Sequence, residues 1–307
     1  YASLNVSGKT TQLNVEATDT SYNYLLYLNK LVVEDGAKAT LQGGRYSELA
    51  NIRNIIIRGE DTEVISNAKL LSHNGFDSCE FVVSDGAYLK VGGGLYLGYG
   101  YNGKVLNGAK VDILASQGGN TPLNVSSNAS LFINNAEVNV YEPEGVSYTG
   151  SYMCYDYNSI IQLVGKDSLL SIEATNPNTK AMYLSSGASV DVSAGTLNLT
   201  SGGEIFYGGS SYGSKCTVTV RDGGTLNAVS DAAKGLAITG SPEVNVSNAA
   251  FYVSKNADNS DETVSSDTVF NLTNAVIEEP SSAYVSEDGK LLKNGYSVTG
   301  DISIVSD

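Results

Sequence analysis

LVVEDGAKATL at residues 31–41 is one copy of a phrase that recurs along this chain. Each copy has a strand of alternating apolar residues, a turn of Asp-Gly or a close relative, and a second alternating strand. The other copies are FVVSDGAYLKV at 81–91, VLNGAKVDI at 105–113, SNASLFI at 127–133, LVGKDSLLSI at 163–172, SGASVDV at 186–192 and VTVRDGGTLNA at 218–228. The turn residues are Gly36, Gly86, Gly108, Asn128, Asp167, Gly187 and Gly223, with separations of 50, 22, 20, 39, 20 and 36 residues. Most separations fall near one or two multiples of about 20 residues, which predicts a solenoid of stacked coils.

The phrases also indicate how such coils would pack. Alternation places one apolar face of each strand in a narrow core and leaves the polar face in water. Asp-Gly and Asn-Gly suit corners where the backbone needs a positive φ. The rival fold is a β-sandwich, or two in tandem, but sandwiches join antiparallel strands by short hairpins and rarely repeat one phrase at one period. The repetition therefore favours an all-β parallel β-helix over a sandwich.

Breaks in the pattern suggest three regions. Residues 1–30 read as an N-terminal cap or first coil, residues 31–253 as the parallel β-helix, and residues 254–307 as an acidic loop followed by a strand-rich C-terminal cap. SELANIRNIII at 47–57 fits either a short helix or a further coil, and we prefer the coil because NIIIRG and TEVISN resemble strands. The chain starts at Tyr1 rather than Met, from which we expect a leader to have been removed.

Composition excludes several classes of function. The 307 residues carry 33 acidic and 18 basic side chains, a net charge of −15, with no cluster of Lys and Arg. Such a surface repels phosphate backbones and anionic membranes, so we expect no nucleic-acid partner. No apolar run approaches the roughly 20 residues that a membrane helix needs. We therefore expect no membrane insertion within this segment.

The three cysteines indicate core packing rather than a metal site. Cys79 and Cys216 occupy the same place in the repeat, since CEFVVSDG at 79–86 aligns with CTVTVRDG at 216–223. Equivalent positions of a solenoid face the same way, so both thiols should point inward. Neither these two nor Cys154 has a C-x-x-C partner or a nearby histidine, and we expect neither a zinc site nor a cofactor.

A second recurrent phrase is an asparagine between two apolar residues. Because neighbouring side chains of a strand point to opposite faces, the flanking Leu or Val should point inward and the asparagine outward. The phrase includes Asn5, Asn14, Asn124, Asn139, Asn198, Asn227, Asn245 and Asn271. Strand alternation alone is enough to generate this triplet.

The phrases DGAKATL, DGAYLKV, NGAKVDI and SGASVDV resemble coils of right-handed parallel β-helix proteins of the pectin-lyase-like superfamily. They are most similar to coils in large bacterial cell-surface and adhesin-like proteins. The resemblance covers residues 31–253 and is one of pattern, so it is specific for fold and unspecific for function. It implies a right-handed parallel β-helix with terminal caps, in an exported or cell-surface bacterial protein.

Tyrosine provides the sharpest candidate for a functional site. The chain has 20 Tyr, 6 Phe and no Trp, and three clusters lie between strands: GLYLGYGYNG at 94–103, VSYTGSYMCYDYNS at 146–159 and EIFYGGSSYGS at 204–214. A tyrosine ring packs against sugar C–H faces, and its hydroxyl forms hydrogen bonds. A glycan-binding groove and purely structural stacking of the rings both remain open. The candidate ligand-binding residues are Tyr96, Tyr99, Tyr101, Tyr148, Tyr152, Tyr155, Tyr157, Tyr207 and Tyr212.

Other motifs give weaker signals. GYGYNG at 98–103 formally matches the dinucleotide-binding pattern G-x-G-x-x-G, but a strand rather than a helix follows it. The single histidine, His73, has no accompanying Ser or Cys motif. Asp258, Asp261 and Glu262 offer oxygen ligands for calcium but lack the glycine of an EF-hand loop, and we favour a solvated loop over a calcium site.

From these observations we expect a non-catalytic protein that acts in adhesion or glycan binding, or as an extracellular scaffold, with a polysaccharide or a cell-surface glycan as its partner. The alternative is a carbohydrate-active enzyme, a polysaccharide lyase or a glycoside hydrolase on the same fold. Such an enzyme needs acidic side chains that converge in one groove. The local patterns of those enzymes are absent here, and the chain has only four arginines. The positions of the tyrosine clusters and of Asp156 separate the two hypotheses, since rings packed into the core would remove the binding hypothesis.

Overall fold

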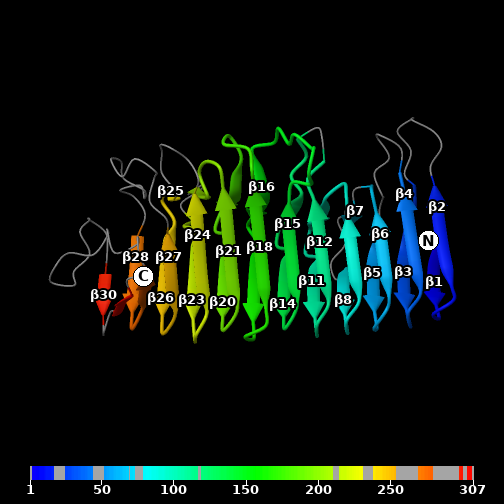
Figure 1. Ribbon diagram of the computed structural model, residues 1–307, viewed down its shortest axis with the longest axis horizontal. Helices are drawn as coiled ribbons and strands as arrows, with labels where there is room; N and C mark the ends of the chain where they lie inside the picture. The colour runs from blue at the N-terminus through cyan, green and yellow to red at the C-terminus, as the bar shows by residue number, and fades with distance from the viewer. Residues whose placement is uncertain are drawn as a thin grey trace.

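The computed structural model describes residues 2–16, 25–43, 52–68, 70–72, 79–116, 119–209, 214–230, 238–253, 269–278, 297–299 and 303–305. In this part of the chain every regular element is a β-strand, and the strands form three parallel sheets. The strands of successive coils lie side by side along the long axis, with β1 and β30 at opposite ends of it (Figure 1). The fold is a parallel β-solenoid, as the repeated phrases predict.

Among the described residues, sheets A and B have 12 strands each and sheet C has seven. Sheet A contains β1 (Ala2–Ser7), β3 (Leu28–Glu34), β5 (Ile52–Arg58), β8 (Glu80–Ser84), β11 (Asn102–Leu106), β14 (Ser130–Asn134), β17 (Ile160–Val164), β20 (Ser189–Ser193), β23 (Thr217–Arg221), β26 (Glu243–Ser247), β28 (Val269–Thr273) and β30 (Ser297–Thr299). Sheet B contains β2 (Gln12–Glu16), β4 (Lys38–Gln42), β6 (Glu63–Ser66), β9 (Tyr88–Val91), β12 (Lys110–Leu114), β15 (Glu137–Tyr141), β18 (Leu169–Ala174), β21 (Thr196–Ser201), β24 (Thr225–Ser230), β27 (Ala250–Val253), β29 (Val276–Glu278) and β31 (Ser303–Val305). Sheet C contains β7 (Leu70–Ser72), β10 (Leu95–Leu97), β13 (Leu123–Ser126), β16 (Tyr152–Tyr157), β19 (Lys180–Ser185), β22 (Phe206–Gly209) and β25 (Ile238–Gly240).

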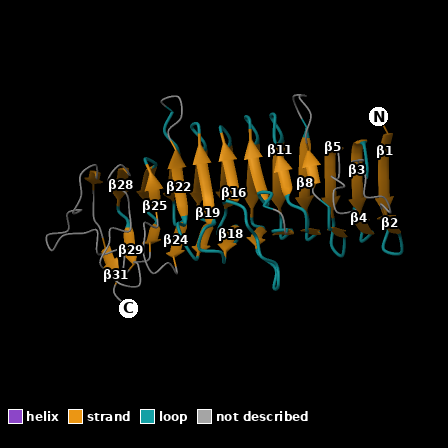
Figure 2. Ribbon diagram, turned by 90° about the horizontal axis from the view of Figure 1, so that it is seen from above, coloured by secondary structure: helices purple, strands orange, loops and turns teal. Residues whose placement is uncertain are grey.

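A full coil runs from sheet A through sheet B to sheet C, and the described strands of sheet C belong to the middle coils (Figure 2). Strand pairing continues across the expected boundaries at residues 30 and 253, because β1 pairs with β3 and β26 pairs with β28. In the stretch 47–57, residues from Ile52 onward belong to β5, which confirms the coil over the helix.

Most coils are longer than the spacing of the turn phrases suggests. In the register of sheet A, Glu80 pairs with Asn102 and Ser130 pairs with Ile160, so the coils also differ in length. The shorter estimate was wrong because two different corners of each coil use the same turn chemistry. Gly108 lies at the corner between sheets A and B, whereas Asn128 lies at the corner between sheets C and A, and both have a positive φ. Counting from one kind of corner to the other produces the false spacing.

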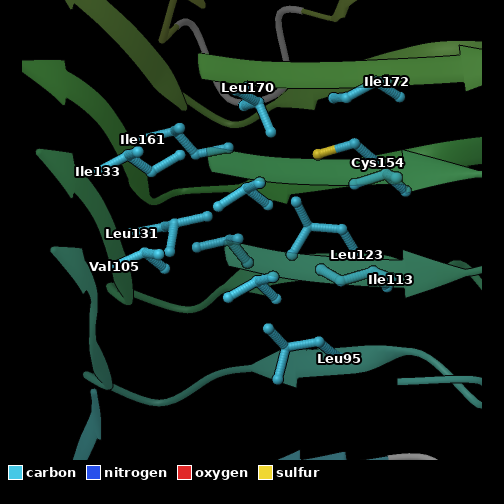
Figure 3. Packing of buried hydrophobic residues seen from close by; sticks show 14 of the residues in the cluster. Leu95, Val105, Ile113, Leu123, Leu131, Ile133, Cys154, Ile161, Leu170 and Ile172 are labelled. Atoms are coloured by element: carbon cyan, nitrogen blue, oxygen red, sulfur yellow. The ribbon is translucent and has the colours of Figure 1, made fainter. Parts of the chain in front are cut away.

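Alternating inward side chains fill the interior. Leu131 and Ile133 of β14, for example, are at most 1% exposed, and in the register they pair with Ile161 and Leu163 of β17. Figure 3 shows the same stacking in sheet C, where Leu95, Leu123 and Cys154 follow one another in three successive strands. Burial of each such aliphatic side chain contributes about 1.5–3 kcal/mol. Cys79 and Cys216 are also buried, which confirms the inward orientation expected from their aligned positions.

Four of the outward asparagines form amide pairs between successive coils. Asn227 Nδ2 donates to Asn198 Oδ1 over 2.8 Å, and Asn271 Nδ2 donates to Asn245 Oδ1 over 2.7 Å. A similar amide pair lies at the corners between sheets C and A, where Asn158 Nδ2 donates to Asn128 Oδ1. Identical amides stacked in register satisfy one another, and this fixes the register of neighbouring strands.

Candidate functional site

The candidate site is a row of tyrosines on the outer face of sheet C. Tyr155, Tyr183 and Tyr207 are register partners in β16, β19 and β22. Their ring centroids are 5.5 Å apart between Tyr155 and Tyr183 and 4.7 Å apart between Tyr183 and Tyr207, with interplanar angles of 21° and 18°. The parallel register therefore converts one tyrosine per coil into a continuous aromatic stack.

Two more rings widen the row at β16. Tyr157 stacks on Tyr155 at a centroid distance of 6.3 Å, and Tyr152 lies 4.5 Å from Tyr183. All five side chains are half-buried, so each keeps part of its surface accessible to solvent. We call the set Tyr152, Tyr155, Tyr157, Tyr183 and Tyr207 the tyrosine face.

In the two strands of sheet C before β16, the row of tyrosines is interrupted by an asparagine. Asn124 of β13 pairs with Tyr155, and Tyr96 of β10 pairs with Asn124. An amide is thus placed between two tyrosines, and its buried Oδ1 has no hydrogen-bond partner among the described residues. The Tyr96 hydroxyl accepts a hydrogen bond from Ser126 Oγ over 3.2 Å.

Ring stacking determines which groups the tyrosine face offers to a ligand. Because adjacent rings cover one another's faces, the inner rings of the stack present their edges and hydroxyl groups. Burial and the neighbouring phenols raise the pKa of Tyr155 and of Tyr183 above the usual tyrosine value. Both phenols therefore remain neutral at physiological pH and act as hydrogen-bond donors and acceptors.

An ion pair lies at one side of this face. Lys180 pairs with Tyr152 in the register, and Lys180 Nζ lies 2.7 Å from Glu204 Oε2. The pair neutralises itself, so the face carries little net charge although the whole chain is strongly acidic.

The other predicted tyrosines lie in different environments. Tyr101 is 2% exposed, and its hydroxyl lies 2.5 Å from the backbone oxygen of Ile52. Tyr148 is completely buried, and its hydroxyl donates to the backbone oxygen of Tyr152 over 2.8 Å. These two rings belong to the core, and we remove them from the candidate surface. Tyr99 is exposed at the corner before β11, and Tyr212 lies outside the described residues.

Tyr183 was missed by the sequence argument, although it lies at the centre of the stack. It stands alone in AMYLS, outside every tyrosine cluster. The three clusters place β10, β16 and β22 in sheet C, and β19 lies between the last two. A correct coil length would have aligned Tyr155 with Tyr183, because the two residues are register partners in successive coils.

A second polar region lies on sheet B, around a shallow hollow of about 250 Å³ lined in part by Lys110, Asp112 and Asn139. Tyr88 Oη donates to Asp112 Oδ2 over 2.8 Å, and Asn139 Nδ2 donates to Asp112 Oδ1 over 2.9 Å. Lys110 Nζ lies 3.1 Å from Glu137 Oε1. Both carboxylates already have protein partners, which is typical of a structural network.

The remaining candidates carry no further support. His73 and the acidic loop with Asp258, Asp261 and Glu262 lie outside the described residues. Within the described ranges, no group of three or more His, Cys, Asp or Glu side chains is placed to hold a metal ion. Likewise, the described residues contain no helix long and apolar enough to cross a membrane.

Comparisons with protein-family models, with curated proteins and with solved structures found no match.

Proposed function

We propose that this chain is a non-catalytic, exported or cell-surface binding protein that holds an extended, uncharged polysaccharide along its tyrosine face. The observation that carries the proposal is the in-register stack of Tyr155, Tyr183 and Tyr207. The stack places one phenol per coil in three successive coils, with ring centroids 5.5 Å and 4.7 Å apart. A linear sugar chain also presents hydroxyl groups at regular intervals along its length.

Charge narrows the class of ligand. The net charge of −15 disfavours acidic polysaccharides, and the face itself supplies neutral phenols together with the Lys180–Glu204 pair. Half-buried tyrosines also suit reversible binding, because their rings lose little conformational entropy when a ligand arrives. The resemblance to bacterial cell-surface and adhesin-like β-helices is consistent with this role, as is the expected extracellular location.

Phenylalanine variants test the proposal directly. The triple variant Tyr155→Phe, Tyr183→Phe, Tyr207→Phe keeps the stacked rings and removes only the hydroxyl groups. We expect the dissociation constant for a bound glycan, identified on an array and measured by calorimetry, to rise by at least tenfold. Tyr141→Phe on sheet B is the matched control and should bind as the wild type does.

Equal affinity of the triple variant and the wild type would refute binding through these hydroxyl groups. Failure of every neutral glycan on the array to bind would refute the proposed ligand class. The alternative function, a polysaccharide lyase or a glycoside hydrolase, remains a prediction. A product-release assay on the same glycans tests it. Release of unsaturated or reducing-end products would overturn the non-catalytic assignment.

A further inference from the structure

Strand β16 carries a carboxyl group on its inner face, directly behind the tyrosine face. Asp156 lies between Tyr155 and Tyr157 in the sequence, and its side chain is completely buried. In the register it lies between Val125 of β13 and Leu184 of β19. The carboxyl group thus occupies a place that aliphatic side chains fill in the neighbouring coils.

The hydrogen bonds around this carboxyl group define its protonation state. Ser159 Oγ lies 2.7 Å from the backbone oxygen of Val125 and is also in hydrogen-bond contact with Asp156 Oδ1. A serine hydroxyl has one proton, and a carbonyl oxygen can only accept. Both contacts form together when Ser159 donates to Val125 and the protonated Asp156 donates to Ser159. The other carboxyl oxygen, Oδ2, has no hydrogen-bond partner among the described residues, which an ionised carboxylate would tolerate poorly.

The surroundings also oppose a negative charge. The register neighbours on both sides of β16 are uncharged, and the titratable groups whose interactions with Asp156 are described are the thiols of Cys154 and Cys216. Burial raises the pKa of both thiols, so they remain neutral at physiological pH. A thiol is never a cation, so neither group can compensate a negative charge on Asp156. Burial likewise raises the pKa of Asp156 to about 7, and it outweighs the lowering effect that a hydrogen bond donated by Ser159 has on that pKa.

We propose that Asp156 is a proton-binding site in the core that couples ambient pH to the order of β16, and through β16 to the tyrosine face. In the protonated form, the hydrogen bonds that link Asp156 to Ser159 and Ser159 to Val125 hold β16 against its neighbours. Loss of the proton puts an unpaired charge in an apolar core, so β16 must admit water or move outward. The same strand carries Tyr152, Tyr155 and Tyr157. The inference does not depend on which ligand the face binds.

The sign of the pH dependence follows from linkage. The folded-state pKa lies above the value of an unfolded aspartate, so the folded protein binds the extra proton between about pH 4 and pH 7. The stabilisation of the folded protein by protonated Asp156 is complete at the acid end of this window and is lost as the pH rises through it. Within the window, the titration of Asp156 raises the equilibrium constant for unfolding by about tenfold per pH unit.

Urea unfolding of the wild type and of Asp156→Asn between pH 4.5 and pH 8.5 tests this dependence. The amide keeps the shape of the side chain and can donate to Ser159, but it cannot ionise. We expect the wild type to lose stability relative to Asp156→Asn as the pH rises to about 7, and then to reach a plateau. Asp167→Asn, at an exposed corner, is the matched control and should show the pH profile of the wild type.

Three further measurements keep the inference falsifiable if Asp156→Asn folds poorly. Asp156→Leu replaces the acid with the residue found at the adjacent register position, and it should remove the same pH dependence. Carbon-13 NMR titration of the wild type reports the carboxyl group of Asp156 itself, and we expect a midpoint near 7. Near-ultraviolet circular dichroism of the tyrosines should change with that midpoint in the wild type alone. A carboxyl midpoint near 4, or parallel stability profiles of the wild type and both Asp156 variants, would overturn the proposal.

Discussion

The stacked tyrosines make a quantitative prediction about coupling between coils. Tyr183 has three ring neighbours, Tyr152 at 4.5 Å, Tyr207 at 4.7 Å and Tyr155 at 5.5 Å. Each aromatic pair contributes about 0.5–1.5 kcal/mol beyond the area that it buries. Loss of the three pairs in Tyr183→Ala, together with a modest transfer term for the half-buried side chain, should therefore lower the free energy of unfolding by about 2–5 kcal/mol.

A double-mutant cycle isolates one of these pairs. Tyr183→Ala and Tyr207→Ala, made singly and together, should give a coupling free energy of about 0.5–1.5 kcal/mol. The matched control is the cycle of Tyr155 with Tyr207, which are separated by the strand that carries Tyr183 and should be additive within about 0.5 kcal/mol. Tyr183→Phe, which keeps the ring, should cost less than about 1 kcal/mol.

The measurement is equilibrium unfolding in guanidinium chloride, followed by far-ultraviolet circular dichroism at constant pH. Equal denaturant slopes in the four proteins of a cycle license the comparison of their free energies. A coupling below about 0.3 kcal/mol between Tyr183 and Tyr207 would refute the stack as a source of stability. Equal losses in Tyr183→Phe and Tyr183→Ala would show that the hydroxyl group, rather than ring stacking, carries the effect.

Three other predictions concern a corner glycine, a glycine within strand β11 and two buried thiols. A Cβ at Gly108 would meet open space, so Gly108→Ala should cost only the backbone strain of its φ of +74°, about 1–2 kcal/mol in a thermal melt. At Gly103 a Cβ would lie 2.7 Å from Leu97 Cδ1, and Gly103→Ala should cost about 1–3 kcal/mol through overpacking; a loss well below about 1 kcal/mol would contradict this packing. Cys154 and Cys216 should resist maleimide at neutral pH until urea unfolds the chain, because burial shields both thiols and raises their pKa; rapid labelling of the folded protein would contradict their burial.

Much of the architecture could be predicted from local patterns. Strand alternation and the Asp-Gly corners indicate a solenoid, and the aligned Cys79 and Cys216 identify an inward position. The coil length could not be obtained by the same route, because Gly108 and Asn128 satisfy the same backbone requirement at different corners. The residues of a turn indicate that the chain bends there, but they do not indicate which two sheets the bend connects.

The candidate site was only partly predictable for a related reason. Clusters of tyrosine mark segments that enter sheet C, but partnership across coils depends on the register. Tyr183 gains its role from strands in the coils before and after its own, and nothing in its immediate sequence distinguishes it. Conversely, Tyr101 and Tyr148 share the composition of the clusters but point into the core. The inward Asp156 looks like any other polar residue until the neighbouring coils surround it with apolar side chains.

The unequal coil lengths have a consequence for engineering. The connection from sheet B to sheet C spans residues 92–94 in one coil and 142–151 in another, yet the strands on both sides of each connection keep their register. Chain length at this corner is therefore decoupled from the stacking of the sheets. The same corner is a natural insertion point for peptide tags or displayed epitopes, which would emerge beside sheet C in a regular array along the rod.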